Sequence, residues 1–91
     1  MAVKEVSVDL RWVRDKKRII KMIYKAIGFE GEAGYNLDAL HDVISAWGIP
    51  TRVTLKNWER FSVREADTAK GIEAVLNDSM MENRDIIFAF K

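Results

Sequence analysis

Four polar residues share one face of a helix that the sequence predicts after residue 36: Asp38, His41, Asp42 and Ser45. Residues spaced by three and four positions lie side by side on a helix surface. Taken alone, this spacing is typical of the solvated face of an amphipathic helix. The alternative is an anionic contact surface that follows a flexible, glycine-punctuated loop at Phe29–Tyr35.

His41 is the single histidine of the chain and lies next to Asp42. An Asp–His pair is suited to general acid–base catalysis, because histidine titrates near neutral pH. However, no nucleophile or oxyanion-binding site of recognisable spacing accompanies the pair, so we predict that the protein is not an enzyme. One histidine with scattered carboxylates matches no zinc or calcium ligand pattern, and no glycine-rich phosphate-binding motif occurs. We therefore expect neither a metal nor a cofactor.

Charge is unevenly distributed along the chain, although the net charge is only +1. Basic residues crowd one early segment: Arg11, Arg14, Lys16, Lys17, Arg18, Lys21 and Lys25. Residues 26–51 contain no lysine or arginine, and they carry four acids: Glu30, Glu32, Asp38 and Asp42. A basic helix is thus followed by an acidic loop and an acidic helix.

The basic segment allows two interpretations. Such a stripe of lysine and arginine is most often the solvated face of a surface helix, but it is also able to follow nucleic-acid phosphates. We interpret Trp12, Trp47 and Trp58 as core or half-buried residues rather than base-stacking platforms. Trp47, at the end of the acidic helix, is also a candidate for an interface.

Alternating or continuous apolar patterns predict three strands, at Glu5–Leu10, Thr51–Leu55 and Asp85–Phe90. Helical periodicity predicts helices at Arg14–Ile27, from Leu37 to Trp47 after an Asn36 N-cap, and at Thr68–Met80, with a short helical piece at Asn57–Val63. The residues expected to face the core are Ile19, Ile20, Ile23 and Ile27 in the first of these helices and Ile72, Val75, Leu76 and Met80 in the last. The almost uninterrupted apolar run of the last segment is typical of a central strand covered on both faces.

The predicted order is therefore β-α-α-β-(α)-α-β. Helices between strands favour parallel pairing, so we predict an α/β fold with a three-stranded, mainly parallel sheet packed with helices. The 91 residues suit a single domain, 1–91, and a hydrophobic content of 48 % indicates a globular protein. No cysteine, signal peptide or membrane-spanning stretch is present, so we expect a cytoplasmic protein.

The segment Gly34–Asp42 resembles the barstar family, which comprises small intracellular inhibitors of secreted microbial ribonucleases. The resemblance depends on the run Asn36-Leu-Asp-Ala-Leu40 followed by Asp42 and Trp47. It extends to Gly71–Leu76 and to the closing segment Asp85–Phe90, and the order of predicted elements agrees along the whole chain. The resemblance implies a barstar-like fold.

The resemblance also implies a mechanism, in which the second helix and the loop before it plug the active site of a ribonuclease in a one-to-one complex. The aspartate that matches Asp42 enters the pocket that normally holds a substrate phosphate. Further contact residues are implied or are nearby candidates: Glu32, Tyr35, Asn36, Asp38, His41, Ser45 and Trp47.

This chain also departs from the family pattern. The family has a tryptophan where this chain has His41, and it has two consecutive tyrosines where this chain has Glu32 and Ala33. A late-helix glutamate of the family is not assigned here, and Asp78 and Glu82 are the acidic candidates. The departures bear on the identity of the target more than on the fold, and they leave open a different ribonuclease or another toxin with a basic cleft.

Three functional hypotheses follow. The leading hypothesis is an inhibitor or immunity protein that blocks a ribonuclease or a related toxin. The second is a nucleic-acid-binding protein that uses the basic helix. The third is a barstar-like fold that serves as a subunit of another assembly.

Overall fold

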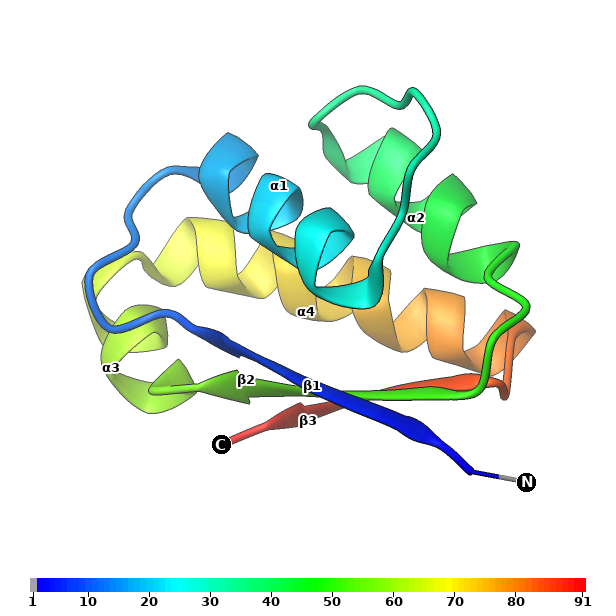
Figure 1. Cartoon of the computed structure of the whole chain (residues 1–91). Coiled ribbons are helices and arrows are strands. Elements are labelled where there is room, and N and C mark those ends of the chain that lie inside the picture. The colour runs from blue at the N-terminus through cyan, green and yellow to red at the C-terminus, as the bar shows by residue number, and fades with distance from the viewer. Residues whose placement is uncertain (1) are drawn as a thin grey trace.

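The computed structural model describes residues 2–91 and has the predicted β-α-α-β-α-α-β order (Figure 1). The strands are β1 (Lys4–Asp9), β2 (Thr51–Lys56) and β3 (Ile86–Phe90). The helices are α1 (Lys16–Ile27), α2 (Leu37–Ser45), α3 (Trp58–Arg64) and α4 (Ala66–Glu82). The α/β fold class is confirmed.

The three strands form one parallel sheet in the order β1-β2-β3. Lys4 pairs with Thr51, and Thr51 pairs in turn with Ile86, so β2 is the central strand. The prediction that the last segment forms a central, doubly covered strand is wrong. β3 lies at an edge, and Ile87 is 49 % exposed on the uncovered face.

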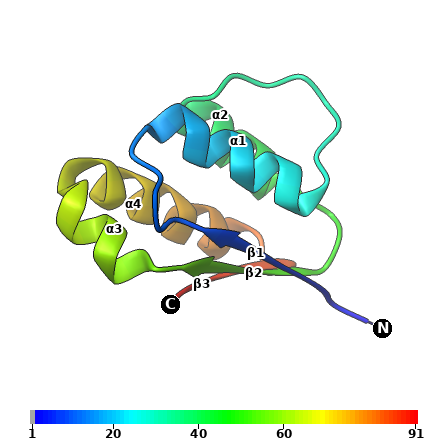
Figure 2. The same ribbon diagram turned by 60° about the vertical axis from the view of Figure 1, so that its left-hand side comes forward.

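Helices α1, α2 and α4 all lie on one side of the sheet, and α3 lies beside its end (Figures 1 and 2). The buried strand residues face these helices: Val8, Val53, Leu55, Ile86 and Phe88. This one-sided cover explains the alternation of buried and exposed residues along β2. On the other face Arg52 pairs with Glu5 at 3.5 Å.

Helix α1 packs against β1 and buries the isoleucines that the sequence predicted: Ile19, Ile20, Ile23 and Ile27. It begins two residues later than expected, because Asp15 is its N-cap. The Asp15 carboxylate accepts a hydrogen bond from the Lys17 N–H at 3.1 Å. Gly28 ends the helix with a φ of 87°, in the left-handed region that glycine adopts without steric cost.

Helix α4 packs against β3 on one side and carries α2 on the other. A methyl group at Gly71 would lie 3.2 Å from Leu37 Cδ1, so the glycine within α4 makes room for the first residue of α2. Val75 and Met80, expected in the core, are only half-buried, whereas Ser79 is fully buried. The Ser79 hydroxyl donates to the Val75 carbonyl at 2.8 Å and is thereby satisfied.

The three tryptophans differ in their burial. Trp58 is half-buried and packs on Phe61 and Phe90, with ring centroids 5.4 and 4.7 Å away. Trp47 is also half-buried. The prediction that Trp12 is a core or half-buried residue is wrong, because its side chain is 83 % exposed. It lies in the connection between β1 and α1, where no periodic pattern reports on burial.

Candidate functional site

Helix α2 and loop 28–36 lie on the side of the molecule away from the sheet (Figures 1 and 2). Asn36 adopts an extended conformation, and its Oδ1 accepts the Ala39 N–H at 2.8 Å, so it caps the helix as predicted. Leu40 and Ile44 are fully buried and fix the rotation of the helix about its axis. This rotation determines which polar residues face outward.

Asp38 and Asp42 are the acids that α2 turns to solvent. The Asp42 side chain is 86 % exposed and Asp38 is exposed as well. Within residues 2–91 neither carboxylate forms an ion pair with a lysine or arginine. Among the described residues, the ion-pair partner within reach of Asp42 is the His41 ring, whose Nδ1 lies 3.8 Å from Asp42 Oδ1. Two acids with unused charge thus face outward from one rigid helix.

His41 and Ser45 turn toward α4, where they meet Glu82. His41 Nε2 lies 2.6 Å from Glu82 Oε2, and the Ser45 hydroxyl donates to the same oxygen at 3.1 Å. Ser45 Oγ and His41 Nε2 are 3.5 Å apart. The four residues of the predicted stripe therefore divide into two solvent-facing acids and two residues that link α2 to α4. Glu82 adds a further carboxylate, 58 % exposed, to the same side.

Tyr24 of α1 anchors loop 28–36 from below. Its ring packs on Phe29 and Tyr35, with centroids 5.2 and 5.8 Å away, and its hydroxyl donates to the Gly34 carbonyl at 3.0 Å. Burial raises the pKa of Tyr24 above the ordinary value for a phenol, and the nearby Tyr35 and Asp42 raise it further. The Asp42 carboxylate is thus close enough to disfavour ionisation of the Tyr24 hydroxyl.

The end of α2 is held by the turn that follows α4. Asn83 Nδ2 donates to the Ile44 carbonyl at 2.9 Å and to the Trp47 carbonyl at 2.6 Å. These bonds add a side-chain donor at the end of α2, where the Ile44 carbonyl also accepts the Trp47 N–H at 3.2 Å. Trp47 Nε1 in turn donates to Thr51 Oγ1 at 3.1 Å, which ties the end of α2 to the start of β2.

A shallow groove of about 490 Å³ runs between loop 28–36 and α2. Its lining is mostly apolar, and Asp42 and Glu32 contribute the charged groups. The lining residues are Phe29, Glu32, Ala33, Ala39, Asp42, Val43, Ala46 and Trp47. The groove brings Asp42, a highly exposed acid of α2, next to apolar surface that another protein is able to cover.

Comparison with protein families gives a match over almost the whole chain. The family model described as barstar (barnase inhibitor) matches residues 3–91. The chain belongs to the barstar family. No curated protein matches it. The match includes all seven helices and strands of the structure, from β1 to β3.

Of the residues that the barstar resemblance singled out, most lie together on this side of the molecule. Tyr35 is 43 % exposed on loop 28–36, and Asn36 serves as the helix cap. Trp47 is partly committed to its bond with Thr51, but it also lines the groove. Glu82, which sequence reasoning left unassigned, is brought to α2 by the packing of α4.

Among residues 2–91 no group of three or more histidine, aspartate or glutamate side chains is arranged to hold a metal ion. In the same part of the chain every helix is too short or too polar to cross a membrane.

Proposed function

We propose that this chain inhibits a ribonuclease, or a related toxin with a basic active-site cleft, by covering the cleft with α2 and loop 28–36 in a one-to-one complex. The observation that carries the proposal is the pair of exposed carboxylates, Asp38 and Asp42, for which residues 2–91 supply no lysine or arginine partner. Membership in a family described as barnase inhibitors supports the same conclusion.

A carboxylate on a rigid helix resembles a substrate phosphate in charge and in its ability to accept hydrogen bonds from guanidinium groups. Such charge-assisted bonds are strong where the partner surface excludes water. The local absence of lysine and arginine from residues 26–51 adds long-range attraction toward a basic cleft, which speeds association at low ionic strength. We assign Asp42 the central contact, because it is highly exposed and lies beside the groove.

The interface that we propose is held in its binding conformation before the target arrives. Loop 28–36 is tied to Tyr24, the start of α2 is capped by Asn36, and its end is held by Asn83. A surface that is already ordered loses less conformational entropy on binding. Because loop and helix are both fixed, we expect this chain to lose little conformational entropy when it binds.

Glu82 is the late-helix acid that we assign to the edge of this interface. Its contacts with His41 and Ser45 place it beside α2, whereas no comparable contact with α2 is formed by Asp78 within residues 2–91. In this arrangement His41 lies between two acids, Asp42 and Glu82. A polar ring thus stands where the family has a tryptophan. We infer that the target differs from those of family members that carry a tryptophan there.

The test is inhibition of a panel of small microbial ribonucleases by the wild type and by Asp42→Ala. We expect the substitution to weaken binding by about 2–5 kcal/mol, the range for truncating one partner of a buried charge pair. That range includes measurements on a barstar–ribonuclease complex, so it is an expectation carried over from the family. Asp67→Ala, which removes an exposed carboxylate from the first turn of α4, is the matched control.

The outcomes are distinct. Inhibition by the wild type and by Asp67→Ala, with loss in Asp42→Ala, would support both the function and the role of Asp42. Equal inhibition by all three proteins would remove Asp42 from the mechanism. If the wild type inhibits no enzyme of the panel, ribonucleases of this type are not the target. Thermal unfolding of each variant checks that the fold is retained.

A further inference from the structure

The connection between β1 and α1 is a rigid turn. Leu10 and Val13 are buried, and the Val13 N–H donates to the Leu10 carbonyl at 3.3 Å. Arg64 of α3 reaches beneath the turn, and its Nη2 donates to the Leu10 and Val13 carbonyls at 3.1 and 2.7 Å. The backbone is therefore fixed on both sides of Trp12.

Trp12 projects outward from this fixed turn. At 83 % exposure it contrasts with the two half-buried tryptophans of the chain. A large aromatic side chain held in solvent by a rigid backbone is unusual, because burying such a ring is strongly favourable. The Arg11 guanidinium lies over its ring at 6.0 Å from the centroid, a cation–π arrangement.

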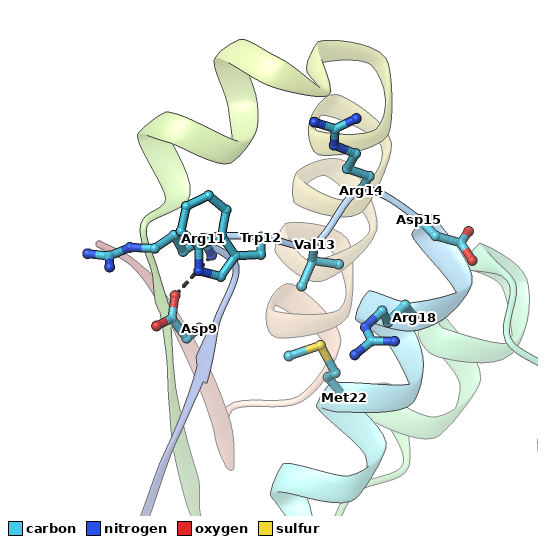
Figure 3. A pocket seen from close by; sticks show the side chains of 8 residues that line it. All are labelled: Asp9, Arg11, Trp12, Val13, Arg14, Asp15, Arg18 and Met22. Atoms are coloured by element: carbon cyan, nitrogen blue, oxygen red, sulfur yellow. Dashed lines mark hydrogen bonds between the residues drawn. The ribbon is translucent and has the colours of Figure 1, made fainter.

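An open hollow of about 500 Å³ lies beside Trp12 (Figure 3). Val13 and Met22 form the apolar part of its lining, between Trp12 on one side and Arg18 on the other. The charged residues that line it are Asp9, Arg11, Arg14, Asp15 and Arg18. The hollow thus combines an exposed aromatic ring and an apolar surface with arginines at its rim, and the Arg11 side chain extends to the side of Trp12 opposite Arg18 (Figure 3).

The two aspartates of the hollow are already used by the backbone around them. Asp9 accepts the Arg11 N–H at 2.9 Å and the Asn57 side chain at 2.7 Å, and Asp15 caps α1. Within residues 2–91 no carboxylate forms an ion pair with Arg14 or Arg18. The exposed Lys16, Lys17 and Lys21 of α1 continue the positive surface.

We propose that this surface binds single-stranded nucleic acid, with a base stacked on Trp12 and neighbouring phosphates held by Arg11, Arg14 and Arg18. Arginine forks fit phosphate oxygens in bidentate fashion, and an exposed aromatic ring accepts any unpaired base. An acidic peptide would satisfy the arginines but would leave the ring without a planar partner. In a duplex the bases are stacked on one another, so none is available to the ring.

The proposed nucleic-acid surface is separate from the inhibitory surface and does not depend on it. It lies at the start of α1, whereas loop 28–36 follows the end of the same helix. A helix of 12 residues is about 18 Å long. The residues that line the hollow beside Trp12 are therefore distinct from those that line the groove beside α2.

The test is fluorescence anisotropy of labelled oligouridylate RNA and oligothymidylate DNA of about 12 nucleotides, within the site sizes of single-strand binders. We expect binding at low salt and a loss of at least about fivefold in Trp12→Ala, with most of the affinity kept in Trp12→Phe. Replacing Arg14 and Arg18 together by glutamine should lower the slope of log affinity against log salt by about 1.4, since each phosphate contact contributes about 0.7 for single strands.

Lys70→Gln, which removes an exposed cation from α4, is the matched control and should leave affinity and slope almost unchanged. The proposal is overturned if the wild type binds neither oligonucleotide at low salt, or if Trp12→Ala binds as tightly as the wild type. Equal binding of a duplex of the same length would exclude stacking. Oligoglutamate serves as a competitor of the RNA. If it displaces the RNA and binds the wild type and Trp12→Ala with the same affinity, the ligand is an acidic protein segment instead.

Discussion

Replacing Tyr24 by phenylalanine removes one hydroxyl group and keeps the buried ring that supports loop 28–36. The variant loses the hydrogen bond from the Tyr24 hydroxyl to the Gly34 carbonyl, 3.0 Å long. Gly34 is exposed, so water replaces the lost donor at the carbonyl, and only the net value of the bond is lost. We expect Tyr24→Phe to lower the free energy of unfolding at neutral pH by about 1 kcal/mol.

The pH dependence gives this prediction a second, independent part. The pKa of Tyr24 is raised in the folded protein, so the phenol ionises more readily in the unfolded chain. The contribution of this group to stability is therefore complete below pH 10 and is lost as the pH rises through the folded-state pKa. Phenylalanine does not ionise, so the stability difference between wild type and Tyr24→Phe should narrow as the pH rises above about 10.

Urea unfolding, followed by tryptophan fluorescence between neutral and strongly alkaline pH, measures both parts. Tyr35→Phe is the control: the Tyr35 side chain is 43 % exposed and its hydroxyl forms no hydrogen bond within residues 2–91, so its stability should stay within about 0.5 kcal/mol of the wild type. If Tyr24→Phe is as stable as the wild type at neutral pH, and the free energies of unfolding of the two proteins change in parallel as the pH rises, Tyr24 does not anchor the loop. If the loop does belong to the inhibitory surface, loosening it should also weaken inhibition, by up to about fivefold for 1 kcal/mol.

Two further predictions concern the ends of elements. Asn83→Ala removes two hydrogen bonds to carbonyls at the end of α2 and should lower the free energy of unfolding by about 1–3 kcal/mol in urea titrations; unchanged stability would show that this end of α2 is held by other contacts. Asp9 has a pKa below its ordinary value, because its carboxylate accepts two hydrogen bonds. The bond from the Arg11 N–H has the larger effect, and the bond from the Asn57 side chain has the smaller one. Asp9→Asn should therefore be less stable than the wild type above about pH 4, and the difference should vanish as the pH falls through the folded-state pKa; a difference that persists in acid unfolding curves would contradict this assignment.

The strands and the buried faces of the helices were predictable, because burial leaves a periodic trace in the sequence. The isoleucines of α1 and the alternation along β2 are examples, and both are confirmed. The place of each strand in the sheet leaves no such trace. β3 carries an almost continuous apolar run, yet Ile87 lies on the uncovered face of an edge strand, because pairing depends on contacts between segments far apart in the chain.

The candidate site was predictable only in part, for the same reason. The acidic face of α2 and its Asn36 cap could be predicted from local spacing. The contact of Glu82 with His41 could not, because it depends on the length of α4 and on how closely that helix packs against α2. The exposure of Trp12 was also beyond local reasoning, since a residue in a connection has no periodic neighbours to indicate its direction.

The parallel sheet has a consequence for when the recognition surface comes into being during synthesis. Lys4 of β1 pairs with Thr51 of β2, and Thr51 pairs with Ile86 of β3. Each strand pair therefore joins residues that are far apart in the chain and must close a long loop. Helix α2 has nine residues, fewer than an isolated helix needs to persist in water, and it lies inside the first of these closures. Because α2 packs mainly against α4, we expect that no fragment of the nascent chain that ends before α4 holds the acidic face in an ordered helix.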